Sequence, residues 1–268
     1  MISARAALCA ALLLAIGACS RPEAGDKTAA AKAQAGPMAL AQAEARAPAQ
    51  PEVVVDKDFG DKVHAYLLAH PEVILEMQDA YVHRQAANEA TQVQSHLSSL
   101  RQQIFDDPRD PSVGPKHAKV TVVEFFDYRC PHCKDAAPDV LNLIRTHPDV
   151  RFVFKEMPIF GEQSQAAAAV ALAANRQGKY LPVYQALMAD HAVNQESISQ
   201  ILTQTGLNPT RTLEESSDPK IATQIADIAR QASSLGVTGT PGFLVNNHYV
   251  AGADIPALTK LIDQQRKG

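Results

Sequence analysis

The sequence predicts an α/β domain that is preceded by a helical segment and an N-terminal export signal. Two short runs rich in β-branched and aromatic residues, 120–126 and 151–154, flank a segment with helical character. A long helical stretch follows, and a hairpin around Asn246-Asn247 precedes a last helix to about residue 265. Strand, helix, strand, helical insertion, hairpin and helix together are typical of a sheet covered by helices.

The composition limits the class of protein. The chain has 268 residues, of which 46% are hydrophobic, so it is long enough for one or two domains with a sizeable core. Lys and Arg number 25 against 29 for Asp and Glu, and no long basic run is present. Nucleic acid is therefore not an expected partner. Four cysteines are too few for a small scaffold held together by disulfides.

The first 18 residues have the features of a secretory signal. Arg5 precedes an apolar run that is too short to span a bilayer. The run ends in Ile16-Gly-Ala-Cys19-Ser20, which resembles the bacterial lipoprotein box. This resemblance implies that Cys19 is lipidated and begins the mature chain, anchored to a membrane facing the bacterial periplasm. Ordinary cleavage nearby, with Cys19 incidental, is the alternative.

Residues 19–55 are predicted to form a flexible tether. They are rich in Ala, Gln and Pro and contain few large apolar side chains, so they cannot bury a core. About 35 flexible residues typically span roughly 30–35 Å. Such a tether is long enough to hold a domain clear of a membrane surface.

Residues 56–110 are predicted to be helical and to mediate self-association. Asp58 is the expected cap of a short first helix, and Pro71 suits the first turn of a longer second one. Apolar residues then recur every three or four positions, and on a solitary helix they would form an apolar stripe exposed to water. We expect homo-oligomer formation through residues 58–105; packing of the stripe on the chain's own domain is the alternative. The stripe comprises Ala86, Ala90, Val93, Leu97, Leu100 and Ile104.

The helical insertion within the domain is predicted at about 162–235. It has an expected helix cap at Asn194, and Asp218-Pro219 is a typical start of a further helix. Gly236 is suited to end that helix.

The chemistry is predicted at Cys130-Pro131-His132-Cys133, directly after the first strand. Thiol–disulfide exchange needs a readily ionised thiol and a second thiol that resolves the mixed disulfide. With Cys130 at the helix cap and Pro131 at the first helical position, unpaired backbone N–H groups and the positive helix end favour the Cys130 thiolate. His132 adds a donor or positive charge. A Cys130–Cys133 disulfide is the expected oxidised form.

Three other uses of this motif are weaker. A zinc site needs further ligands, and His117, His147 and His191 have no paired spacing that would complete one. Haem attachment requires a histidine where Lys134 stands. A purely structural disulfide across so short a loop would remove little entropy from the unfolded chain. No metal site and no cofactor beyond the redox-active sulfurs is expected.

Two segments carry a family resemblance. Val123–Lys134, which contains the two cysteines, and Gly236-Val-Thr-Gly-Thr-Pro-Gly-Phe-Leu-Val245 together resemble DsbA-like thioredoxin-fold oxidoreductases. The match covers about residues 115–268. The N-terminal helices resemble the oligomerisation region of the ScsC-type branch, whose members include trimeric disulfide isomerases. The expected fold is thus thioredoxin-like with a helical insertion, after an N-terminal oligomerisation segment.

The resemblance implies roles for single residues. Cys130 matches the attacking cysteine and Cys133 the resolving one. Pro241 matches the cis-proline whose loop binds the substrate backbone, and Thr240 the residue before it that contacts the redox pair. Glu124, on the same strand face as two core residues, matches an acid that moves protons to and from the resolving cysteine. Lys155 on the next strand is its expected partner, and exposure of Glu124 to solvent is the alternative.

The expected function is thiol–disulfide exchange on exported proteins that contain cysteines, either as an isomerase or as a dithiol oxidase. Several active sites around a shared space favour isomerisation, whereas the CPHC pair resembles that of strongly oxidising members. A membrane reductase or oxidase would be the redox partner. A Cu(I)-binding or chaperone role in copper tolerance is the alternative from another class, since soft thiolates suit Cu(I).

Overall fold

A computed structural model describes residues 56–268 of the chain. The predictions for residues 1–55, which are the signal, the lipidated Cys19 and the tether, lie outside the described residues. Helix α1 (Lys57–Ala69) is capped by Asp56, whose side chain accepts a hydrogen bond from the backbone N–H of Asp58. The cap is thus two residues earlier than predicted. None of the described helices combines the length and apolar character needed to cross a bilayer.

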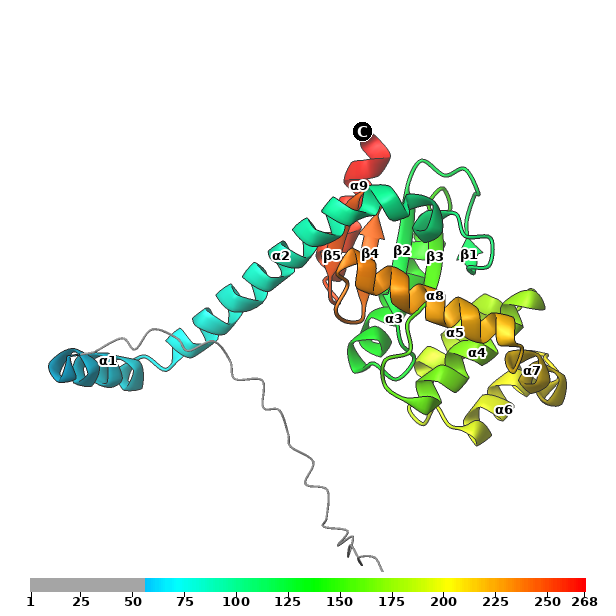
Figure 1. Ribbon diagram of the computed structural model, residues 1–268, viewed down its shortest axis with the longest axis horizontal. Coiled ribbons are helices and arrows are strands. Elements are labelled where there is room, and N and C mark those ends of the chain that lie inside the picture. The colour runs from blue at the N-terminus through cyan, green and yellow to red at the C-terminus, as the bar shows by residue number, and fades with distance from the viewer. Residues whose placement is uncertain (1–55) are drawn as a thin grey trace, which may run out of the picture. The chain divides into compact units, whose positions relative to one another are not determined.

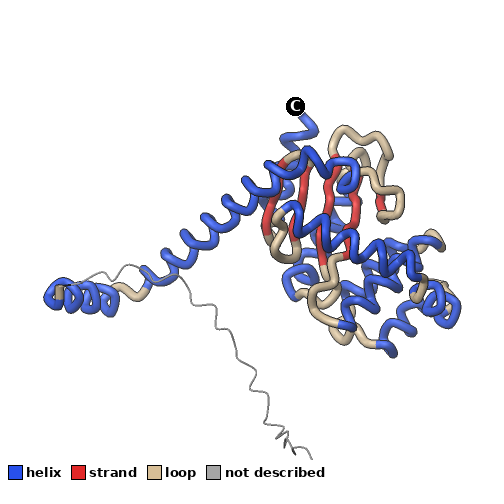
Figure 2. The backbone as a smooth tube through the Cα atoms, viewed as in Figure 1, coloured by secondary structure: helices blue, strands red, loops and turns tan. Residues whose placement is uncertain are grey.

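A mixed five-stranded sheet lies at the centre of the domain, as Figure 2 shows with the strands in red. Strands β2 and β3 are parallel, and β4 is antiparallel to β2 on its other side. Asn246-Asn247 forms the predicted hairpin turn between β4 and β5. The strand order is β1-β3-β2-β4-β5, with bounds β1 Ser112–Val113, β2 Thr121–Phe126, β3 Arg151–Glu156, β4 Gly242–Val245 and β5 His248–Ala251.

Successive residues of β2 serve the two faces of the sheet in turn, as strand geometry requires. Val122 and Phe126 pack into one core, whereas Val123 and Phe125 pack into the other. The β2–β3 register pairs Phe125 with Lys155, so the Lys155 side chain shares the second face. This register decides which partner each buried charged group meets.

The first face carries the helix that follows β2 and most of the helical insertion. Helices α3 (Pro131–Thr146) and α9 (Ile255–Lys267) contribute apolar side chains to its core. Asn194 caps one insertion helix, and Asp218 and Gly236 delimit another, as predicted. The insertion helices are α4 Glu162–Arg176, α5 Tyr180–Ala189, α6 Gln195–Gln204, α7 Pro209–Ser216 and α8 Pro219–Leu235.

The second face is covered by α8 and by the C-terminal part of α2 (Glu72–Phe105), which run along the same side of the sheet in Figure 1. Val93, Leu97 and Ile104 are buried there, and Leu100 is partly buried. The prediction that this stripe mediates self-association is therefore wrong, because its apolar side chains already pack on the chain's own sheet. Periodicity reports that a helix face is buried but not what covers it.

The apolar side chains upstream of this contact remain exposed. Helix α1 has no buried residue, and the fully buried residues of α2 begin at Val93. Nine large apolar side chains in this region are 39% to 70% exposed. We call them the N-terminal apolar surface: Phe59, Val63, Tyr66, Leu68, Ile74, Leu75, Met77, Tyr81 and Val82.

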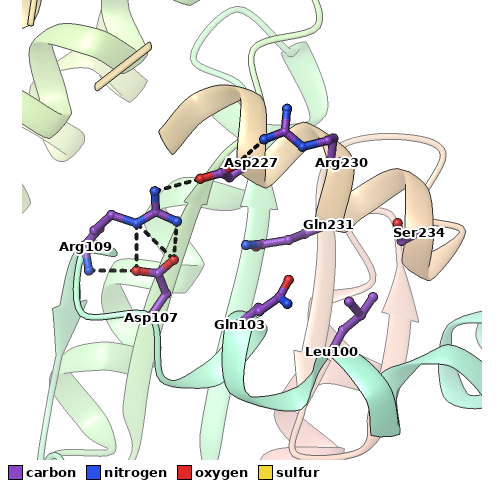
Figure 3. A pocket seen from close by; sticks show the side chains of 8 residues that line it. All are labelled: Leu100, Gln103, Asp107, Arg109, Asp227, Arg230, Gln231 and Ser234. Carbon is purple, nitrogen blue, oxygen red and sulfur yellow. Dashed lines mark hydrogen bonds and ion pairs between the residues drawn. The ribbon is translucent and has the colours of Figure 1, made fainter. Parts of the chain in front are cut away.

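The segment after α2 is fastened to the domain by charged groups. Arg109 binds Asp107 in the same segment and Asp227 on α8, beside a polar pocket of about 290 Å³ (Figure 3). Asp110 forms a buried ion pair with Lys155, whose ammonium also donates to Gln231. Short strand β1 then pairs with β3. The end of α2 is therefore an integral part of the domain.

Candidate active site

Cys130 occupies the N-cap of α3, and Pro131 is the first helical residue, as predicted. Strand β2 ends at Phe126, and a tight turn follows in which the N–H of Cys130 donates to the carbonyl of Asp127. Proline fits the first helical position because the helix needs no N–H there. Cys130 and Cys133 are both free thiols, which is the reduced form of the pair.

The cis-proline loop faces Cys130 from a distant part of the chain. This loop, Val237–Pro241, joins α8 to β4, and its Thr240–Pro241 peptide bond is cis. The Cys130 sulfur lies 3.2 Å from the carbonyl oxygen of Thr240. Antiparallel pairing of β4 with β2 brings these segments together although 110 residues separate them.

The two thiols have opposite pKa shifts. The hydrogen bond with the Cys133 side chain lowers the pKa of Cys130 to about 5. Burial opposes this shift, whereas the Thr240 side chain and the backbone N–H groups of Cys133 and His132 add to it. Burial raises the pKa of Cys133, and the neighbouring Cys130 and Glu124 add to this. One sulfur is thus ionised at neutral pH while the other keeps its proton.

Cys130 lies just beneath the molecular surface. Its residue is 2% exposed, but Pro131, His132 and Thr238 around it are exposed. Cys130 is therefore flanked by the start of α3 and by the cis-proline loop, whose Thr240 carbonyl contacts its sulfur.

Glu124 is buried, 2% exposed, on the same face as the cysteines. Tyr184 donates to one carboxyl oxygen at 3.1 Å, while the other oxygen has no hydrogen-bond partner among the described residues. Burial raises the pKa of Glu124 to about 8, against the opposing effect of Tyr184. The carboxyl group is therefore protonated at neutral pH and is close enough to Cys133 to affect its pKa.

Lys155 is not the partner of Glu124, and that prediction is wrong. Its ammonium lies on the opposite face of the sheet, paired with Asp110. Because Glu124 pairs in register with Phe154, the side chains of Glu124 and Lys155 point to opposite cores. No cation among residues 56–268 pairs with Glu124, so burial dominates its ionisation.

A second buried carboxyl was not predicted from the sequence. Glu156, two register positions beyond Glu124 on the same face, accepts hydrogen bonds from Tyr128 at 3.0 Å and Tyr180 at 2.8 Å. Burial raises its pKa well above the usual range. The sequence signal for this residue is strand alternation, because Glu156 follows the core residues Phe152 and Phe154 at every second position of β3.

Asp127 is another residue that sequence reasoning missed. One of its oxygens accepts from the N–H groups of Ile159 (2.6 Å) and Phe160 (3.0 Å), and the other accepts from Ser164 at the start of α4. Ile159 and Phe160 are 47% and 44% exposed. An aspartate three residues before Cys130 thus holds an apolar loop beside the turn that carries the thiol.

Replacing Glu124 by glutamine is expected to make stability less dependent on pH. The folded-state pKa of about 8 lies above the ordinary value of 4.5, so the native carboxyl retains a proton that the unfolded chain has lost. Wild-type stability therefore falls as pH rises from about 4.5 to 8, by up to about 1.4 kcal/mol per pH unit. Glu124→Gln lacks this loss. Urea denaturation should show its unfolding free energy gaining on wild type between pH 4.5 and 8.

The matched control is Asp139→Asn, which removes an exposed carboxyl group from α3. The difference in unfolding free energy between this variant and wild type should be the same at pH 4.5 and at pH 8. An equally constant difference for Glu124→Gln would contradict a buried, protonated carboxyl at this position.

A readily ionised thiol at a helix N-terminus, a buried second thiol one turn later and a facing cis-proline loop are the site geometry of the thioredoxin-fold thiol–disulfide oxidoreductases. The family model of the DSBA-like thioredoxin domain matches residues 121–261, more than half of the chain. The chain belongs to this family. A second model, the N-terminal domain of the copper resistance protein ScsC, matches residues 57–88.

Solved structures and a curated relative resemble the chain over most of their own length. A thioredoxin-like oxidoreductase from Silicibacter pomeroyi is 38% identical, with a TM-score of 0.59 over 63% of this chain and 98% of that one. ScsC of Proteus mirabilis in a transitional conformation is 26% identical, with a TM-score of 0.59 over 79% and 98%. The thiol:disulfide interchange protein DsbA of Bordetella pertussis is 27% identical over 65% of this chain and 86% of its own.

The first curated relatives are much longer proteins. The Na(+)/H(+) antiporter NhaA 1 of Salinispora arenicola is 32% identical over 161 residues, or 59% of this chain. The chain spans about a quarter of the length of that protein.

Proposed function

We propose that this protein exchanges and isomerises disulfides in exported proteins, with Cys130 as the nucleophile and Cys133 as the resolving thiol. The observation that carries this proposal is the opposite ionisation of two neighbouring thiols at a helix N-terminus that faces Thr240 and Pro241. The thiolate is the attacking species in disulfide exchange, and an acidic thiol is also a good leaving group.

The reaction begins with attack of the Cys130 thiolate on a substrate disulfide. The substrate S–S bond breaks, a mixed disulfide forms, and the other substrate sulfur leaves as a thiolate. In isomerisation a different substrate thiolate attacks the substrate sulfur of the mixed disulfide, so that a new substrate S–S bond forms, the S–S bond to Cys130 breaks and the Cys130 thiolate is regenerated. No net oxidation occurs, and no cofactor beyond the two sulfurs takes part.

A second outcome of the mixed disulfide is attack by Cys133. This attack forms the Cys130–Cys133 disulfide and passes two electrons to the substrate, and the reverse direction oxidises a substrate dithiol. The Cys133 proton must leave before its sulfur attacks, and Glu124 is the neighbouring carboxyl that we assign as its acceptor after ionisation. His132, exposed next to Cys130, stabilises the thiolate, and the Thr240-Pro241 backbone pairs with the substrate.

Exposure of the N-terminal apolar surface supports isomerisation over simple oxidation. A soluble chain rarely leaves so many large apolar side chains exposed unless a partner covers them. We propose that further copies of this chain cover them, since residues 57–88 match the ScsC N-terminal domain. Association there would place several Cys130 sites around one substrate.

The test uses a scrambled multi-disulfide protein and, separately, its reduced form. Wild type is expected to recover the native disulfides of the scrambled substrate, whereas Cys130→Ser is expected to be inactive. Equal activity of the two would reject the assignment. Fast oxidation of the reduced substrate without isomerisation would instead identify a dithiol oxidase, and Cu(I) retention lost only when both cysteines are replaced would favour the copper role.

Removal of residues before Ala86 is expected to give a monomer with an intact active site. The deletion removes the N-terminal apolar surface but retains Val93 and all later core residues. Sedimentation should show an oligomer for the full chain and a monomer for the deletion. The deletion should keep exchange with a small disulfide but lose isomerisation. A monomeric full chain would contradict the proposed association.

We also propose that the protein works in the periplasm, attached to a membrane through lipidated Cys19 and recharged or reduced by a membrane redox partner. Cys19→Ser should release it from the membrane fraction. Retention of the variant in that fraction would contradict this anchor.

A further inference from the structure

Helix α2 reaches the cis-proline loop through one side chain. Oxygen Oε1 of Glu89 accepts hydrogen bonds from the backbone N–H of Thr238 at 3.0 Å and from its hydroxyl at 3.3 Å. The Tyr249 hydroxyl donates to the same oxygen at 3.0 Å. These residues lie 149 and 160 positions along the chain from Glu89, so the contact depends entirely on the docking of α2.

Thr238 is two residues from the carbonyl that contacts Cys130. Between them lies Gly239, around which a Cβ atom would meet no neighbouring atom within 4 Å. The hydrogen bond from the Thr238 N–H to Glu89 thus anchors a loop that is loosely packed at Gly239. On the other side of the loop, the Tyr249 ring packs directly over Gly242.

We propose that Glu89 is a positioning residue, which holds the cis-proline loop against Cys130 and so makes the N-terminal helix part of the support of the active site. The proposal rests on the proposed function as far as substrate exchange is concerned. The carboxylate acts through Thr238 and does not touch the reacting sulfurs. Because the Thr240 carbonyl of this loop contacts the Cys130 sulfur, the loop position affects both ionisation and substrate binding.

The first readout is hydrogen exchange of the Thr238 amide. Its protection is expected to fall by about tenfold or more in Glu89→Ala, because a hydrogen bond to a charged acceptor is lost. Glu89→Gln retains a carbonyl oxygen at the same reach and should restore most of the protection. Glu89→Asp keeps the charge, but its side chain is shorter, so it should not restore the protection of the Thr238 amide.

The second readout is the pH dependence of Cys130 alkylation. The Thr240 side chain helps to lower the pKa of Cys130, so the midpoint should move to higher pH when the loop is released. A general loss of stability would not move it. Glu76→Ala is the matched control. Glu76 is an exposed glutamate of the same helix, and its replacement removes the same charge.

The third readout is exchange with a peptide disulfide. Glu89→Ala is expected to raise KM by about tenfold with a smaller change in kcat, since the loop binds the substrate backbone. Wild-type Thr238 protection and an unmoved alkylation midpoint in Glu89→Ala would overturn the proposal, as would equal changes in Glu76→Ala. If wild type itself exchanges no disulfides, the proposed function fails, while the first two readouts still decide the role of Glu89.

Discussion

Replacing Cys133 by alanine is expected to stop the oxidation and reduction of substrates and to leave substrates without a further thiol covalently attached to Cys130. The Cys130 thiolate still attacks a substrate disulfide, because its low pKa also depends on Thr240 and backbone N–H groups. The mixed disulfide then lacks the buried thiol that resolves it. Electrophoresis without reductant should show adducts that disappear on reduction.

Cys130→Ala is the matched control and should form no adducts, because Cys133 is fully buried and its raised pKa keeps it protonated. Alkylation of the wild type provides an independent check. Cys130 should react at a nearly constant rate at pH values well above its pKa of about 5 and slow below it, whereas Cys133 should react only on unfolding. Adducts in Cys130→Ala but none in Cys133→Ala would reverse the assigned order of attack.

A chain that begins at Pro111 is expected not to fold, in contrast to the chain that begins at Ala86. It lacks Val93, Leu97, Ile104 and Phe105, which fill the core on the second face of the sheet. Truncation of one such side chain to alanine typically costs about 2–5 kcal/mol. Four such losses are together as large as, or larger than, the roughly 5–15 kcal/mol of stability that domains usually have.

The same deletion also removes Asp110, the buried partner of Lys155. A buried charge without its partner typically causes a further loss of about 3–5 kcal/mol in stability. Circular dichroism and urea denaturation of both chains should reveal the difference. Within the chain from Ala86, Leu97→Ala should lose about 2–5 kcal/mol, whereas Gln94→Ala, at an exposed position of the same helix, should change little. Equal urea midpoints of the two deletion chains would show that α2 is dispensable for the fold.

Much of the chemistry was predictable because it depends on local sequence. Cys130 and Pro131 lie at a helix start because a strand precedes them and proline suits the first helical turn. The cap at Asn194 and the helix end at Gly236 follow from single side chains and a left-handed backbone position. Each of these features involves residues within one turn of each other.

The buried interactions of charged groups were not predictable in the same way. Glu124 was correctly placed on the core face by alternation, yet its expected partner Lys155 lies on the other face. The residue that hydrogen-bonds Glu124 is Tyr184, from the helical insertion. Only the register of β2 against β3 decides this, and a shift of one residue would exchange the faces.

Local sequence patterns are sufficient to predict an α/β chain with a CPHC pair at a helix start and a helix with one apolar stripe. Only the three-dimensional packing shows that this stripe covers the protein's own sheet and that Glu89 reaches Thr238, whereas contact of Thr240 with the redox pair was expected from the family resemblance. The physical reason is that periodicity and capping depend on near neighbours, whereas the choice of packing partner depends on strand register and on helix docking between segments more than 100 residues apart.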